Sequence, residues 1–169
     1  MDYKISIAGI VEIEETHVMG FSNTVPINSV KEKYLENLKR LEKLLVGVEE
    51  IGFNISIIKS YNPLEKNMEV VFGVAAELAE AANNILQEKN GVWAILPPHP
   101  TVLKIKLSGE RLHLKEAWDK SFTFIADNKL IVDTYANPWE VYISNLETEI
   151  YIPLIITKDK DLEKLAVKF

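Results

Sequence analysis

The stretch DTYANPWEVYISN, from Asp133 to Asn145, contains the segment on which the fold prediction depends. Aromatic and β-branched residues fill its middle, and Asn-Pro and Ser-Asn bound it, which is typical of a strand. A glutamate, Glu140, lies in the centre of that strand. Because strand side chains alternate between the two faces of a sheet, Glu140 and Tyr142 share one face and Trp139 lies on the other.

The segments on either side of this strand extend it into a larger unit. A second strand at Glu149 to Thr157 pairs with Tyr135 to Ser144 as a hairpin. Upstream, Thr101 to Gly109 alternates apolar residues with lysines, as a half-buried strand does. A helix between them, with Asn128 as a left-handed stop, is predicted from the apolar stripe Leu114, Trp118, Phe122 and Ile125.

The first half of the chain follows the same order. Ile5 to Val25 predicts one long strand, or two strands broken near Gly20. Ser29 and Glu32 have the form of a capping box at the start of a helix that stops at Gly47. Two strands in a hairpin then follow, Phe53 to Tyr61 and Met68 to Leu78.

We therefore predict an α+β fold built from a duplicated strand-helix-strand-strand unit. The antiparallel sheet carries two main helices on one face, with a central ligand cleft where the halves meet. The repeats cover about residues 1–78 and 91–157 of a single 1–169 domain, with a short tail at 158–169. Between the repeats, Ala79 to Pro100 indicates a short helix and then NGVWAILPPHP, whose prolines end any regular element.

Composition excludes several functional classes. The chain has 169 residues, 47% of them hydrophobic, which is enough for one sizeable core. A net charge of -6 without a Lys/Arg cluster argues against direct nucleic-acid binding. The acidic N-terminus and the lack of a run of about 18 apolar residues predict a cytoplasmic protein without a membrane span.

Metal, cofactor and common catalytic motifs are also missing from the sequence. There are no cysteines, and the three histidines are far apart, so we expect no metal site and no cofactor. No Ser-His-Asp arrangement, Gly-x-Ser-x-Gly elbow, phosphate-binding loop or dinucleotide fingerprint is present.

The central glutamate raises a physical question of its own. If Glu140 faces the helices, ionisation next to apolar surface is costly unless a cation or good donors compensate it. An organic cation would do so, and aromatic rings would add cation–π and stacking contacts. The ordinary alternative is a glutamate exposed on the solvent face or paired with a lysine.

The run SGERLHLKEAWDKSFTFIADNKLIVDTYANPWEVYISNLETEIYIPLI resembles the second half of the GyrI-like, or AraC-type effector-binding, domain family of bacterial transcription activators. The resemblance rests on Gly109 after a strand, Trp118 in the middle of a helix, WEVY at Trp139 to Tyr142, and TEIYIPLI at Thr148 to Ile155. VMGFS and VFGVAAE in the first half agree more loosely.

The resemblance implies a pocket for small, often cationic and amphipathic molecules. Such domains act as sensors in transcription regulation, as modulators of DNA gyrase, as integron cassette products and, in a few cases, as hydrolases of cyclopropane-type toxins. Because the duplicated fold takes up this chain, we expect a free-standing member similar to integron cassette drug-binding proteins. We favour binding over catalysis, with a hydrolase using the same glutamate, or a protein that contacts gyrase or a regulator, as alternatives.

The resemblance carries ligand-binding roles onto Glu140 and Tyr142, and adds Trp118 as a wall of the pocket. Tyr34 holds a comparable place on the first helix, although core packing is the ordinary role there. Further candidates around the predicted cleft are Phe21, Tyr151, Trp139 and Trp93. A tryptophan at 139 on an open sheet face would favour a homodimer. The acidic runs VEIEE and VGVEEIG would serve a protein partner, although solvated charge is their ordinary role.

Overall fold

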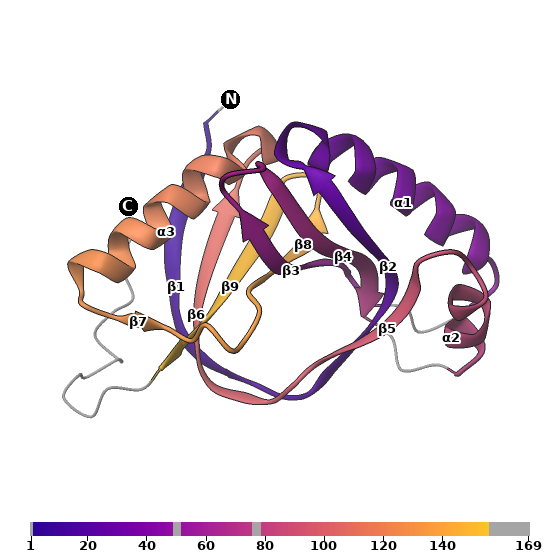
Figure 1. Cartoon of the computed structure of the whole chain (residues 1–169). Coiled ribbons are helices and arrows are strands. Elements are labelled where there is room, and N and C mark those ends of the chain that lie inside the picture. The colour runs from indigo at the N-terminus through magenta and orange to yellow at the C-terminus, as the bar shows by residue number, and fades with distance from the viewer. Residues whose placement is uncertain (1, 49–51, 76–78, 156–169) are drawn as a thin grey trace. The chain divides into compact units, whose positions relative to one another are not determined.

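The protein is described from a computed structural model (Figure 1), which covers residues 2–48, 52–75 and 79–155. It divides into two compact units, one formed by residues 1–14 with 98–169 and the other by residues 15–97. No helix in the described ranges is long and apolar enough to cross a membrane. The described elements are nine antiparallel strands with three α-helices, and the predicted α+β class is confirmed.

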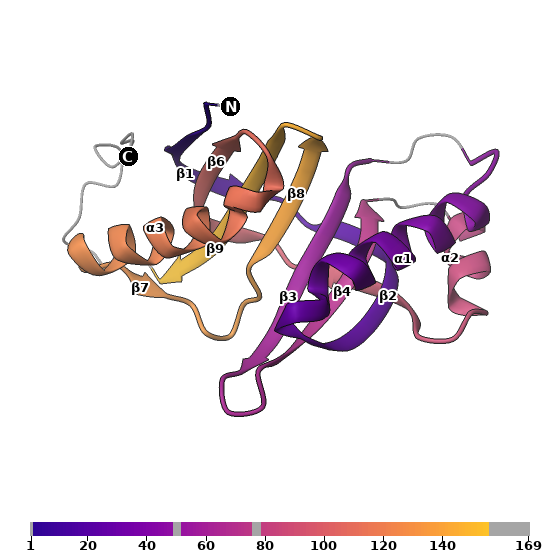
Figure 2. The ribbon, with the colours of Figure 1, turned by 90° about the horizontal axis from the view of Figure 1, so that it is seen from above.

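The unit that contains Glu140 is a four-stranded antiparallel sheet in the order β1-β6-β9-β8, with β7 paired to the end of β9. Its elements are β1 (Lys4–Ile13), β6 (His99–Ser108), η2 (Arg111–His113), α3 (Leu114–Asp127), β7 (Ile131–Val132), β8 (Trp139–Ser144) and β9 (Glu147–Ile155). Helix α3 packs on one face of this sheet, as Figures 1 and 2 both show. Its core side chains meet those of β6 and β9, and they include Ala117, Phe124 and Ile125.

The other unit is a sheet in the order β3-β4-β2-β5. Its elements are β2 (Thr16–Pro26), η1 (Ile27–Ser29), α1 (Val30–Leu44), β3 (Asn54–Asn62), β4 (Asn67–Ala75), α2 (Ala79–Leu86) and β5 (Gly91–Leu96). Leu41 of α1, Leu45 directly after α1 and Ile85 of α2 belong to a core that also contains Met19 and Phe21 of β2. The loop after α1 passes through Gly47, whose φ of 80° suits glycine.

The duplicated order is present as β2-α1-β3-β4 and as β6-α3-β8-β9. The strands do not group along the predicted repeat boundaries, because β1, from the first predicted repeat, pairs with β6 of the second. The single domain over 1–169 stays a prediction, and its tail at 158–169 lies outside the described residues.

Several local predictions were wrong. The opening segment breaks between Ile13 and Thr16, and Gly20 lies inside β2 instead of at a break. Within the described structure, Ser29 makes no side-chain capping hydrogen bond, so the capping box does not form. The left-handed residue after α3 is Lys129, with a φ of 51°, instead of Asn128.

Strands β5 and β7 were missed, for different reasons. β5 was hidden by the prolines that follow it, which end the strand at Leu96 but do not prevent it from pairing with β2. β7 has only two residues, Ile131 and Val132, too few to form a recognisable pattern. The predicted hairpin strand begins at Trp139 instead of Tyr135.

Candidate functional site

Glu140, the second residue of β8, faces helix α3. In the sheet register it lies in one row with Ile150 of β9, Ile105 of β6 and Ile7 of β1. These three isoleucines are core residues that are at most 4% exposed, and Glu140 itself is 8% exposed. The carboxylate therefore takes the fourth place in a row of apolar side chains, as expected for a glutamate on the helix-facing side of the sheet.

Two neutral donors hold the carboxylate. The indole Nε1 of Trp118, from α3, donates to Oε2 at 3.3 Å, and the hydroxyl of Tyr142 donates to Oε1 at 3.4 Å. Trp118 is partly buried against the core and stacks on Phe122, with ring centroids 5.8 Å apart. The structure thus brings together three of the residues predicted from the sequence, each carboxylate oxygen having one donor.

Burial governs the protonation of Glu140. Loss of water raises the pKa of its carboxyl from 4.5 to about 7, and the hydrogen bonds from Trp118 and Tyr142 and the charge of Arg111 oppose this shift. Within the described part of this unit, no ion pair joins Glu140 to a basic side chain. The side chain can therefore carry either a proton or a charge near neutral pH.

Arg111 is a charged neighbour that the sequence prediction did not include. Its guanidinium carbon lies 4.5 Å from the centroid of the Tyr142 ring, and its Nη2 donates to the Ser144 carbonyl oxygen at 3.4 Å. Arg111 belongs to the short helix η2, which no periodic pattern marks. Only its place in the SGERLH run, between a strand end and a helix start, could have suggested it.

Thr148 was also missed. It lies directly opposite Tyr142 in the β8–β9 ladder, on the face that α3 covers, and it is 0% exposed. Among the described residues, its Oγ1 atom has no hydrogen-bond partner. A buried hydroxyl in this condition is uncommon in native proteins, so within the described structure a second polar group on the helix-facing side of the sheet lacks a protein partner.

Trp139 and Tyr151 lie on the opposite face of the sheet from Glu140. They are directly paired across β8 and β9 and their rings stack at 5.0 Å with an angle of 4°. Tyr151 also donates to Glu149 at 3.1 Å, and Lys104 pairs with Glu149 at 2.7 Å. The structure does not bring these two rings to the carboxylate. Trp139 is 5% exposed, so it does not provide the open aromatic face on which the homodimer prediction rested.

The remaining three candidates belong to the other unit. Phe21 is 0% exposed and lies under the guanidinium of Arg40, 3.7 Å from the ring centroid. Tyr34 of α1 meets Phe72 edge to face at 6.0 Å. Trp93 is 42% exposed and donates to Nδ1 of His17 at 2.9 Å. Their ligand-binding roles, and the predicted central cleft, stay predictions.

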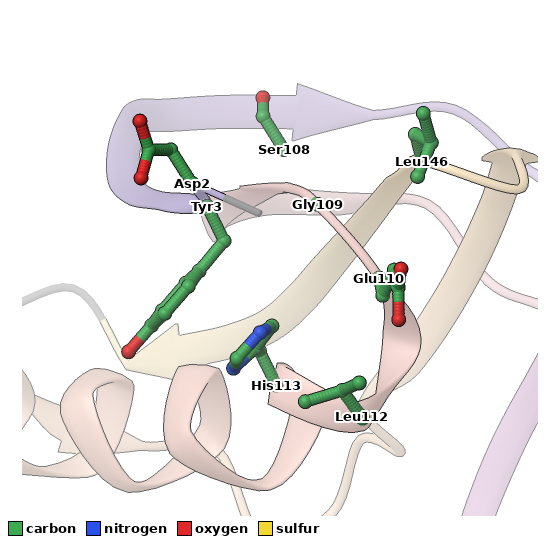
Figure 3. Close-up of a pocket in the computed structure, with 8 residues that line it drawn as sticks. All are labelled: Asp2, Tyr3, Ser108, Gly109, Glu110, Leu112, His113 and Leu146. Atoms are coloured by element: carbon green, nitrogen blue, oxygen red, sulfur yellow. The ribbon is translucent and has the colours of Figure 1, made fainter.

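A pocket of about 350 Å³ lies elsewhere in the Glu140 unit (Figure 3). Its lining residues are Asp2, Tyr3, Ser108, Gly109, Glu110, Leu112, His113 and Leu146. Tyr3 stacks on His113 at 3.6 Å and donates to Glu116 of α3. Glu116 also pairs with Lys120 at 3.1 Å, so its carboxylate has partners on α3 and on the N-terminal side of β1 other than Glu140.

Among the described residues, no cluster of three or more His, Cys, Asp or Glu side chains could hold a metal ion. His99 accepts from the Thr101 amide at Nδ1, so its Nε2 carries the proton and donates to Asp133 at 3.0 Å. In the acidic run at residues 11–15 the glutamates are exposed, and part of the second acidic run lies outside the described residues.

Several solved structures of other proteins share this fold. The EcmrR C-terminal domain superposes with a TM-score of 0.66 at 20% identity, covering 93% of this chain and all of that domain, 100%. This chain spans 58% of the EcmrR chain in its DNA complex. An integron cassette protein from the mobile metagenome of Vibrio cholerae matches with a TM-score of 0.62 at 15% identity, covering 89% of this chain and 99% of that one.

SAV2435, solved bound to tetraphenylphosphonium, matches with a TM-score of 0.60 at 12% identity, over 92% of this chain and 94% of that one. No family model matches the sequence. No curated protein matches it either. The likeness therefore shows the fold, and the fold is the GyrI-like, effector-binding fold that the sequence predicted.

Proposed function

We propose that this protein binds a small, hydrophobic organic cation whose positive group lies against the carboxylate of Glu140. The single observation that carries the proposal is the buried carboxylate held by two neutral donors, Trp118 and Tyr142, at 3.3 and 3.4 Å. An ionised carboxylate in an apolar core is costly unless a cation compensates it. A ligand cation would supply that compensation and thereby gain affinity over a neutral molecule of the same shape.

The neighbouring rings suit a cation with an aromatic or aliphatic body. Trp118 stacks with Phe122 on α3, which gives a flat apolar surface beside the carboxylate. A cation within about 6 Å of such a ring gains about 0.5 to 2 kcal/mol. The buried Thr148 hydroxyl offers a hydrogen bond to a polar group on the same molecule. Charge selection would therefore come from Glu140, and most of the affinity from apolar contact.

A fold neighbour supports the ligand class. SAV2435 was solved with tetraphenylphosphonium, a large lipophilic cation, and shares the fold of this chain at 12% identity. At 12% identity the likeness gives no information on individual residues, so the proposal depends on Glu140 and its two hydrogen-bond donors. Whether binding serves sequestration, sensing for a separate regulator, or contact with DNA gyrase would follow from partner experiments with the bound protein.

A calorimetric titration tests the proposal. The probes are tetraphenylphosphonium, the neutral triphenylphosphine oxide, and the anion tetraphenylborate, which closely matches the phosphonium in shape. At pH 8 we expect a dissociation constant on the order of micromolar for the cation, with at least tenfold weaker binding of the other two, about 1.4 kcal/mol. Glu140→Gln should remove the preference for the cation over the anion of matching shape. Equal affinity for all three probes would refute charge selection.

Hydrolysis is the second candidate, and one observation favours it. Burial raises the pKa of Glu140 to about 7, the range in which a carboxylate is an effective general base at neutral pH. In that role Glu140 would direct a water molecule at a bound electrophile such as a cyclopropane-type toxin. Mass spectrometry of the protein incubated with cationic and cyclopropane-containing compounds decides the matter, because a receptor returns its ligand unchanged.

A further inference from the structure

The turn between β6 and α3 determines the position of Arg111. The strand ends at Ser108, and Gly109 takes a φ of 147°, which suits glycine, before the short helix η2. This turn brings Arg111 against β8, where its Nη2 donates to the Ser144 carbonyl oxygen at 3.4 Å. The guanidinium then lies over the Tyr142 ring, 4.5 Å from its centroid.

One aromatic ring therefore has two polar neighbours. The face of Tyr142 holds the Arg111 guanidinium, while the hydroxyl of the same ring donates to Glu140 at 3.4 Å. Arg111 forms no ion pair with Glu140 among the described contacts of this unit, yet its charge acts on the carboxylate and opposes the rise of its pKa. The protein thus places a cation of its own beside the group proposed to select cations.

We infer that Arg111 is a specificity-determining residue of this site. It is an internal cation that competes with a cationic ligand for the face of the Tyr142 ring and for attraction to the Glu140 carboxylate. The inference rests on the proposed function. A guanidinium is always charged and stacks well on aromatic faces, so it is an effective occupant of the place that a ligand cation would take. Only a ligand with enough apolar contact elsewhere would bind against it.

Arg111 has two opposite effects on a cationic ligand, and pH separates them. Its charge favours the ionised form of Glu140, which helps a cation to bind near neutral pH. The same charge repels that cation at every pH. At pH values well above the pKa of Glu140 the carboxylate is fully ionised with or without Arg111. In that range only the repulsion between Arg111 and the ligand affects binding. The groups that face Glu140 and bear on this titration are Arg111 from η2 and Tyr142 from β8, while α3 contributes the non-titrating Trp118.

The test is the affinity for tetraphenylphosphonium from pH 5 to 9 in the wild type and in Arg111→Gln. In the wild type, affinity should rise with pH through about 7 and then level off. In Arg111→Gln the midpoint of this rise in affinity should move to higher pH, because the charge that lowers the Glu140 pKa is gone. The affinity on the high-pH plateau should be about fivefold tighter or more. A merely structural role for Arg111 would weaken binding at all pH values without moving the midpoint.

Three further variants keep the test decisive. Arg111→Met also removes the charge but retains an unbranched apolar stem against Tyr142, and it replaces Arg111→Gln if circular dichroism shows that variant to be unfolded. Arg111→Lys restores the charge and should restore a midpoint close to the wild-type one. Lys106→Gln removes a positive charge that is paired with Glu147 at 2.9 Å, and it should change neither midpoint nor plateau.

The two proposals fail in different ways. If the wild type does not distinguish tetraphenylphosphonium from the neutral and anionic probes, the proposed function fails. If the wild type does distinguish them, but Arg111→Gln and Arg111→Met keep its midpoint and plateau, the proposed function stands and competition by Arg111 is refuted.

Discussion

Trp118 of helix α3 and Glu140 of strand β8 are joined by a hydrogen bond of 3.3 Å from the indole N–H to a carboxylate oxygen. The bond connects the helix layer to the sheet at the one charged position in a row that otherwise consists of isoleucines. It helps to satisfy the carboxylate but does not cancel its cost, because the pKa of Glu140 still rises to about 7. The pair therefore couples the stability of this unit to pH.

Glu140→Gln should remove that coupling. The folded pKa of about 7 lies above the ordinary 4.5, so the folded protein binds more protons than the unfolded chain between these values. The Glu140 contribution to stability is therefore greatest below about pH 4.5 and falls as pH rises to about 7. The free energy of unfolding of Glu140→Gln minus that of the wild type should grow by about 3 kcal/mol between pH 4.5 and 8.

Urea denaturation at several pH values measures this difference, in which other titrating groups cancel. Glu69→Gln is the matched control, because Glu69 is exposed on β4 and its variant should differ from the wild type by an amount that does not change with pH. A Glu140→Gln difference that is equally independent of pH would show that the carboxylate is solvated in the folded state.

Trp118→Phe should raise the pKa of Glu140 further. The change keeps an aromatic ring against Phe122 but removes the N–H that stabilises the charged carboxylate. We expect the affinity for tetraphenylphosphonium at pH 7 to fall about fivefold, which corresponds to about 1 kcal/mol for one hydrogen bond. The pKa itself is measured by a carbon-13 NMR titration of the glutamate carboxyl groups.

Trp139→Phe is the matched control for that change. It removes the same indole N–H from the neighbouring sheet position, where the ring stacks on Tyr151 on the face opposite to Glu140. The Glu140 titration should stay at its wild-type midpoint. Equal shifts in both variants would mean that loosening of the sheet, instead of loss of the donor, changes the carboxylate.

Local patterns in the sequence were sufficient for the order of elements. The stripe of Trp118 and Ile125 predicted α3, and the alternation around Lys104 predicted β6. The pairing of β1 with β6 could not be predicted, because nothing local in β1 distinguishes a strand that stays with its own repeat from one that joins the other. Prolines obscured β5 because they predict where a strand ends, but give no information on whether one precedes them.

Alternation along β8 correctly placed Glu140 and Tyr142 on one face and Trp139 on the other. Alternation alone could not determine which face is buried, and the resemblance to a known family supplied that step. Arg111 and Thr148 escaped prediction for a physical reason. Their importance depends on contacts between elements, a ring stack from η2 to β8 and a ladder position from β9 to β8, which no local pattern records.

Gly20→Ala should destabilise the protein by about 3 kcal/mol or more, through overpacking of a paired strand. An added Cβ at this position would lie 2.0 Å from the Phe72 carbonyl oxygen, and Gly73 lies directly opposite in the β2–β4 ladder. Thermal unfolding followed by circular dichroism measures the effect. Gly47→Ala is the control, because an added Cβ there meets nothing within 4 Å and its φ of 80° alone should cost about 1 kcal/mol. Similar losses in both would rule out the close strand approach at Gly20.

Thr148→Val should stabilise the ligand-free protein by about 1 kcal/mol, because it replaces a buried hydroxyl that has no hydrogen-bond partner among the described residues by a methyl group of similar size. Thr148→Ser retains the hydroxyl and loses the methyl group, so it should be destabilised by about 1 kcal/mol. Urea denaturation at pH 8 compares the three proteins. A Thr148→Val variant that is as unstable as Thr148→Ser would show that the hydroxyl has a partner in solution, and Thr148 could then not be counted as a polar group awaiting a ligand.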